Sequence, residues 1–190
     1  FYNPYPTLQE EGLNQLAIFI DEDAPGVDEG KALNSESMIT SGMNEVLTLY
    51  TGAVRGKEES DLKHTPLLTT GDQSGLIPLS TLVDISRGRK QLNQALSPES
   101  QVPYLSVAVA IEGKSGSSTS AAATSTTTDE QDDSAEVNSS KSVSVAADLR
   151  AVYVADTDLM LPEFSAIRAD PDSLTEVKYQ FQNVTFILNC

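Results

Sequence analysis

The sequence predicts an α/β fold, in which helices cover a sheet of buried strands, and three observations support this class. Two short runs, residues 104–111 (YLSVAVAI) and 151–155 (AVYVA), are apolar almost without interruption. Such runs are typical of strands covered on both faces, as in a central strand of an α/β sheet. Residues 173–190 place apolar side chains three and four positions apart, the pattern of an amphipathic helix. Buried strands together with such a helix indicate a helix-covered sheet.

Further strands are expected earlier in the chain. Residues 15–20 (QLAIFI) are a short apolar run that stops at the acidic loop 21–26, so we expect a buried strand there. Residues 40–52 begin with polar side chains and end in EVLTLYTG, which predicts a short helix running into a strand. Residues 65–70 (TPLLTT) predict a strand in which Pro66 lies at the start, where a missing amide donor is tolerated.

Two stretches have helical spacing. In residues 173–190, Ser173 is the expected N-cap and Glu176, three residues on, completes a capping box. The apolar face of this helix consists of Leu174, Val177, Phe181, Val184 and Leu188. In residues 79–96 the helical spacing is interrupted by Gly88, and we expect a loop with one helical turn.

A polar run at residues 114–142 separates the two best predicted strands. Between Glu112 and Glu136 no apolar residue is larger than alanine, so this stretch cannot bury enough surface to offset the entropy of ordering it. We therefore expect a long disordered polar loop, inserted into a single domain that spans residues 1–190. Its acidic residues also allow a modification or cation site, but such tracts are usually solvated connections. These acids are Asp129, Glu130, Asp132 and Asp133.

Charge and composition exclude some classes of function. The chain carries 28 acidic and 12 basic residues, a formal net charge of -16, so it repels nucleic-acid backbones and anionic lipid headgroups. No stretch approaches the roughly 18 apolar residues that span a bilayer. The chain begins at Phe1 and stops at Cys190 within an apolar run, from which we expect a piece of a larger, membrane-anchored protein. Contact with a membrane would then involve parts outside this sequence.

Reactive groups are few. His64 is the only histidine and Cys190 the only cysteine, and their separation in sequence argues against a nucleophilic pair. The sequence has no GxxxxGK[ST] or GxGxxG motif, so we expect no nucleotide or other cofactor. Asp156 and Asp158 follow a predicted strand and could hold a hard cation, although acids there more often end the strand or cap the next helical turn. The glycosylation pattern at Asn183 lies on the predicted helix, which favours a chance match.

Four motifs are weak singly and informative in their order. Residues 45–52 (EVLTLYTG) are a strand that enters a turn, and residues 65–70 (TPLLTT) are a second strand. Residues 105–113 (LSVAVAIEG) come third, and residues 152–159 (VYVADTDL) with 183–189 (NVTFILN) complete the series. In this order the motifs resemble the extracytoplasmic region of the ABC-transporter auxiliary family, typified by the gliding-motility component GldG.

The sequence departs from that family's pattern at Ala155, where the family tends to have glycine, and in the length of its polar insertion. The resemblance implies a Rossmann-like or class I glutamine-amidotransferase-like three-layer sandwich without catalytic residues, and it leaves open whether the chain holds the complete sheet. It also implies a place on the extracytoplasmic, periplasmic face of a bacterial membrane. The implied partners are an ABC permease and ATPase or other transport components, and a homo-oligomer is also allowed.

Two functions are consistent with these observations. The first, which we favour, is a non-catalytic interaction domain of an export or gliding-motility-like transport system, which docks through apolar patches onto transport subunits or another copy. The second is a small-ligand or sugar-binding module, or a degenerate hydrolase. That site would use Thr69, Thr70, Asp156 and Asp158 at the carboxyl ends of the strands. The first is preferred because a fold alone carries no activity.

Overall fold

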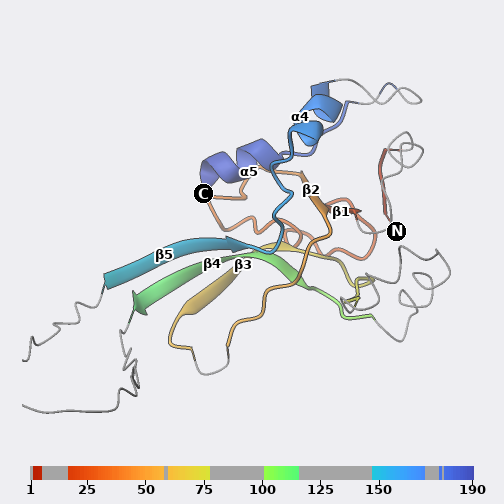
Figure 1. Cartoon of the computed structure of the whole chain (residues 1–190). Coiled ribbons are helices and arrows are strands. Elements are labelled where there is room, and N and C mark those ends of the chain that lie inside the picture. The colour runs from red at the N-terminus through yellow and green to blue at the C-terminus, as the bar shows by residue number, and fades with distance from the viewer. Residues whose placement is uncertain are drawn as a thin grey trace, which may run out of the picture.

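The computed structural model describes residues 2–5, 17–57, 60–77, 101–115, 147–169, 176 and 178–190. Five strands and two helices lie in these ranges, and each strand pairs antiparallel with its neighbours. The strands form a two-stranded sheet and a three-stranded sheet (Figure 1). The predicted helical turn at 79–96, the polar loop at 116–142 and the predicted N-cap Ser173 lie outside the described residues.

The smaller sheet pairs β1 (Ala17–Asp21) with β2 (Glu45–Leu49). Its register runs from Ala17 opposite Leu49 to Asp21 opposite Glu45. Both strands confirm the predictions made from their apolar runs. The short helix expected before β2 is wrong, because residues 40–42 form turns and Gly42 has a φ of 76°, which is incompatible with a right-handed helix.

The larger sheet has the order β3 (Lys63–Thr69), β4 (Ser106–Ser115) and β5 (Ala147–Val154), and it confirms three predicted strands. In this sheet β4 is antiparallel to both neighbours, unlike the central strands of a Rossmann-like sheet. The polar loop also begins later than predicted, since the ladder between β4 and β5 continues through Lys114 and Ser115. Lys114 is accommodated at this end of the hairpin because its side chain remains exposed to solvent.

The position of β5 at the sheet edge differs from the prediction. Its apolar run predicted cover on both faces, but Ala151 is exposed and Tyr153 is 56% exposed. On the other face Val152 and Val154 pack against the core. The strand is therefore covered on one face, which a continuous apolar run does not reveal.

The segment that follows β2 connects the two sheets through backbone hydrogen bonds. The Gly52 N–H donates to the Ala155 carbonyl at 2.8 Å, and the Val54 N–H donates to the Ser106 carbonyl at 2.7 Å. This segment thus lies beside β4 where β5 has ended, and it fixes β2 relative to the larger sheet.

Two helices follow the larger sheet, α4 (Pro162–Ala169) and α5 (Asn183–Asn189). Pro162 is the first residue of α4, where a proline removes no helical hydrogen bond. The long helix predicted over residues 173–190 is confirmed only in its last part, which is α5. Glu176, the expected capping-box residue, has a φ of 56° and therefore does not lie in a right-handed helix.

The core consists of two clusters. The first lies between the larger sheet, the β1–β2 pair and α5, and its members include Ile20, Val46, Leu68, Val107 and Phe186. The second is largely aromatic and contains Tyr5, Phe19, Phe164, Tyr179 and Phe181. Figure 1 shows the β1–β2 pair and both helices above one side of the three-stranded sheet.

These elements make the fold mixed α/β, as predicted. The described strands are all antiparallel and do not confirm a Rossmann-like or glutamine-amidotransferase-like three-layer sandwich. Neither described helix has the length and apolar character that crossing a bilayer requires.

Candidate functional site

The four predicted ligand-binding residues lie at one end of the larger sheet. Strands β3 and β5 both run antiparallel to β4, so their carboxyl ends lie at the same end of the sheet. Thr69 and Thr70 lie at the end of β3, and Asp156 and Asp158 follow β5. Because β4 lies between the two pairs, two strand spacings, about 10 Å, separate them.

The two threonines have different surroundings. Thr70 is buried, its hydroxyl accepts the Leu105 N–H at 3.0 Å, and its own N–H donates to the Leu105 carbonyl at 2.9 Å. Thr69 instead lines an open surface hollow of about 530 Å³ together with Asn34, Tyr104 and charged residues of the 28–36 segment. Thr70 therefore fixes the chain before β4, whereas Thr69 is available at the surface.

The Asp156 carboxylate is occupied by the backbone. It accepts the Leu49 N–H at 2.9 Å and the Asp158 N–H at 2.7 Å. Burial raises the pKa of this carboxyl group, and the backbone donors, including the Leu159 N–H, oppose that rise. Across the described ranges, no three His, Cys, Asp or Glu side chains converge as metal ligands would. Asp156 thus joins the end of β5 to β2.

Side chains of Asp156, Gln182 and Asn183, which we call the β2 joint, occupy the outer edge of β2. The Asn183 amide accepts the Leu47 N–H at 3.0 Å and donates to the Leu47 carbonyl at 2.7 Å. The Gln182 side chain accepts the Asn44 N–H at 2.7 Å. Together these groups take the place of a third strand.

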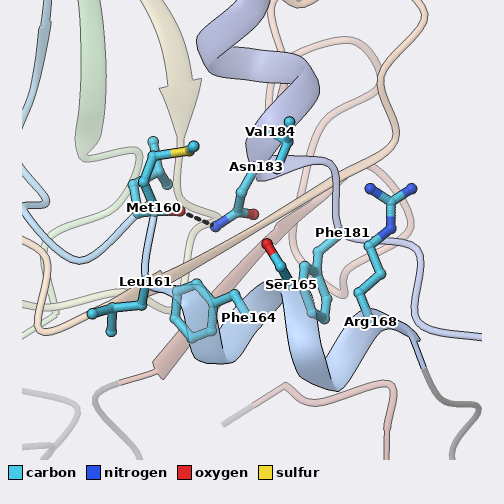
Figure 2. A pocket seen from close by; sticks show the side chains of 9 residues that line it. Met160, Leu161, Phe164, Ser165, Arg168, Phe181, Asn183 and Val184 are labelled. Atoms are coloured by element: carbon cyan, nitrogen blue, oxygen red, sulfur yellow. Dashed lines mark hydrogen bonds between the residues drawn. The ribbon is translucent and has the colours of Figure 1, made fainter.

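Asn183 also reaches beyond β2. Its amide donates to the Leu159 carbonyl at 2.9 Å, the bond drawn in Figure 2. Since this side chain is buried with its oxygen and nitrogen both bonded, it is not accessible for glycosylation. The glycosylation pattern is a chance match, as expected.

Sequence reasoning missed two buried carboxyl groups where Asp21 faces Glu45 across the β1–β2 sheet. The Tyr5 hydroxyl donates to both Glu45 oxygens, at 3.0 and 3.1 Å, and the Tyr2 hydroxyl donates to Asp21 at 2.7 Å. The Gln180 N–H in turn donates to the Tyr5 oxygen at 2.8 Å. The N-terminal segment is therefore held on the sheet by the two acids.

The electrostatics of this pair are unusual. Glu45 is 4% exposed, and burial, with a contribution from the Asp21 charge, raises its carboxyl pKa to about 7. The Tyr5 hydrogen bond and the Arg168 guanidinium oppose that rise. Burial also raises the pKa of the Tyr2 and Tyr5 hydroxyls. The only signal in the sequence is an acid that borders each apolar run, Asp21 after the first and Glu45 before the second, which does not reveal burial.

A small pocket of about 20 Å³ lies between α4 and the start of α5. Figure 2 shows its lining, with Phe164 and Phe181 on the apolar side, Ser165 and Arg168 on α4, and Asn183 at its edge. The pocket is shallow and open, and the Asn183 amide is already bonded to the backbone. Among the described residues, its lining includes one cation, Arg168, and no carboxylate, thiol or imidazole.

His64 and Cys190 occupy unrelated parts of the described structure. His64 lies on β3 beside Gly56, and Cys190 ends α5, where its thiol donates to the Phe186 carbonyl at 3.3 Å. Burial raises the pKa of this thiol, which disfavours the reactive thiolate.

Exposed apolar side chains follow the outer face of α5. We call Met38, Met160, Val184 and Leu188 the apolar strip. Met160 and Val184 line the same pocket (Figure 2), and Val184 and Leu188 are one helical turn apart. The Asn189 amide donates to the Ile39 carbonyl at 2.9 Å, which brings the Met38 segment to the end of α5.

The comparisons with known proteins identify one family. A family model described as an ABC-type uncharacterized transport system matches residues 22–190, most of the chain. Neither the search of curated proteins nor the search of solved structures gave a match. The gliding-motility branch stays a prediction. The motif order and this match lead to one conclusion: the chain belongs to the ABC-type transport-system auxiliary family.

Proposed function

We propose that this chain is a non-catalytic accessory domain that docks onto the membrane-embedded permease of an ABC-type transport system, on the extracytoplasmic face of a bacterial membrane. Family membership supports the transport role. The observation that carries the docking role is the apolar strip, in which Met38 is 92% and Leu188 80% exposed. Contiguous apolar side chains at a surface commonly mark a contact with another protein.

The chemistry of the described residues also favours docking over catalysis. The Thr70 hydroxyl and the carboxylate of Asp156 bond to backbone groups, and the Asn183 amide does the same. Two of the four predicted ligand-binding residues, Thr70 and Asp156, therefore already have a structural use. An acidic surface, with a net charge of -16, keeps such a domain away from anionic headgroups while an apolar surface engages a partner.

Co-purification tests the docking surface. The protein is co-expressed with the permease and ATPase of an ABC-type transport system from the same organism, and the complex is isolated in detergent. We expect Leu188→Asp to lower permease recovery at least about tenfold, because a charge is then desolvated in the contact. Leu76→Asp, at another exposed leucine outside the strip, serves as the matched control and should retain the permease.

Equal recovery of the permease with Leu188→Asp and wild-type protein would contradict this surface. Loss with both aspartate variants would also contradict it, since the effect would not be specific to the strip. Thermal melts of each purified variant check that the fold is retained.

A small-ligand or sugar-binding module, or a degenerate hydrolase, is the second candidate, because Thr69 lines the surface hollow next to acidic residues of the 28–36 segment. A tight cation site there or at Asp158 would raise the melting temperature by several degrees when calcium or magnesium is added. We expect no shift with either ion or with chelator. A clear shift would favour the ligand-binding candidate, and its loss in Asp158→Asn would place the site at Asp158.

A further inference from the structure

We propose that two copies of this chain associate through the outer edge of β5, so that their three-stranded sheets become one continuous antiparallel sheet. Three observations support this proposal. One edge of the larger sheet is covered by the chain itself and the other is unpaired among the described strands. Charged side chains alternate in rows across the sheet, and those rows favour one pairing register. The inference is independent of the transport role.

The opposite edge of the larger sheet, β3, is closed by the chain itself. The Asn34 N–H donates to the Leu67 carbonyl at 3.0 Å, and the Thr69 N–H donates to the Ala32 carbonyl at 2.9 Å. The Asn34 side chain donates to the Pro66 carbonyl at 2.8 Å. The β3–β4 register is also interrupted around Pro66. Proline and such irregularities are devices that prevent edge pairing.

The edge formed by β5 lacks these devices. Its register with β4 is regular from Ala147 to Val154, and its sequence, ADLRAVYV, has no proline or lysine. The Ala155 N–H donates to the Val107 carbonyl at 2.9 Å, so alternate residues before it also face β4. The backbone groups of Asp148, Arg150 and Val152 therefore point outward. Among the described residues, no strand pairs with this edge.

Charges alternate across one face of the sheet and end at β5. In one row Lys63 faces Glu112 with a 3.7 Å ion pair, and Glu112 faces Arg150. In the next row Lys114 faces Asp148. One row thus ends at β5 with a positive charge and the neighbouring row with a negative charge. Both Asp148 and Arg150 are exposed.

A second copy of β5 completes both rows in a single register. With a twofold axis at Leu149, Asp148 of each copy lies opposite Arg150 of the other. Each row then reads Lys63, Glu112, Arg150, Asp148 of the second copy and Lys114 of the second copy, which alternates in sign throughout. Directly opposite side chains in such a pair are close enough to interact, at about 5 Å between Cβ atoms.

Neighbouring registers are less favourable. An axis at Arg150 or at Asp148 places like charges opposite each other, which is destabilising. An axis at Ala151 places Arg150 opposite Val152 and leaves both charges without a partner. In the proposed register Asp148 and Arg150 also exchange backbone hydrogen bonds with the other copy, because their N–H and carbonyl groups point outward.

The overall charge of -16 per copy opposes association, but salt screens repulsion beyond about 8 Å at physiological ionic strength. The complementary rows act within that distance. A weak dimer is therefore expected for the chain in solution, and attachment of both copies to one membrane would raise their effective concentration.

Sedimentation velocity of the whole 190-residue chain, up to about 1 mM, tests the proposal. We expect a wild-type dimer, and we expect Asp148→Arg or Arg150→Asp to weaken it at least about tenfold, because each change creates two like-charge contacts across the axis. The double variant D148R/R150D restores opposite charges and should return the dissociation constant to within about threefold of wild type.

Matched controls distinguish the loss of this contact from a general effect of the altered net charge. Glu36→Arg and Lys31→Asp change the net charge by the same amounts at exposed residues away from β5, and they should leave the dimer unchanged. A wild-type chain that stays monomeric, single variants that dimerise normally, or a double variant that is not restored would each overturn the proposal.

Amide hydrogen exchange gives an independent readout. The Arg150 amide should become protected as protein concentration rises, because it then donates to the second copy. The Ala151 amide already faces β4, so its protection should not depend on concentration. Concentration-independent exchange at Arg150 would contradict pairing through this edge even if dimers were seen.

Discussion

Asp156 and Asn183 show how side chains can serve in place of a strand. Both bond to the β2 backbone, at sequence separations of 107 and 136 residues. The resemblance to the transport family pointed to both positions, but their common partner could not be predicted, because nothing in the local sequence says which distant backbone a polar side chain will meet. The same holds for Glu45, whose burial depends on Tyr5, 40 residues away.

Glu45 should make stability depend on pH. Its folded-state pKa of about 7 exceeds the unfolded value near 4.5, so the native state binds the proton more tightly. The resulting stabilisation is fully present below the unfolded pKa and is lost as pH rises through about 7, at a cost on the order of 2 kcal/mol between pH 5 and 8. Urea unfolding across this range measures the loss. Glu45→Gln, which cannot ionise, should flatten the curve.

Glu112→Gln is the matched control, because this glutamate is exposed on β4. It should keep the wild-type dependence on pH. A pH curve that is unchanged by Glu45→Gln would show that the carboxyl group ionises normally in the folded protein.

At the scale of elements, apolar runs predicted the strands well, whereas helices were predicted poorly. Tyr179 and Phe181 are both buried with the exposed Gln180 between them, which is the alternation of an extended segment. Combined with α5, this alternation produced helical spacing over residues 173–190 by coincidence. Helix α4 was missed because Phe164 is its only buried residue, too little for a recognisable periodic pattern.

The attachment of α5 depends on Phe186, whose side chain is fully buried in the first core cluster. We expect Phe186→Ala to lower the free energy of unfolding by about 3 to 5 kcal/mol, from lost burial and the cavity that remains. Leu188→Ala, on the exposed face of the same helix, should change it by less than about 0.5 kcal/mol. Urea unfolding of both variants makes the comparison. Similar losses in both would mean that helix formation, and not packing, sets the cost.

For the whole molecule, the net charge of -16 should matter more than any single ion pair. Acidic side chains repel one another in the compact state, and salt screens that repulsion. Raising sodium chloride from about 0.02 to 0.3 M should therefore raise the melting temperature by a few degrees. Repeating the melts with potassium chloride distinguishes general screening, which both salts provide, from specific binding of sodium. A melting temperature that falls with both salts would mean that attractive ion pairs dominate.

The class of fold was predictable from the sequence, whereas the direction of the strands was not. The run at β4 is apolar because β4 lies between two strands with Val107, Ala108 and Val109 all buried, and this requirement is the same in parallel and antiparallel sheets. The edge position of β5 likewise depends on what lies beside it, which its own composition does not encode.

The β2 joint can form only late in the synthesis of this protein. During synthesis β1 and β2 emerge from the ribosome long before Gln182 and Asn183 exist, and a lone hairpin is marginally stable in water. The edge of β2 must therefore remain unpaired until Gln182 and Asn183 have been translated. Nascent chains that stall before Asn183 would leave this edge open to other growing polypeptides, so quality control by chaperones is most needed at that stage.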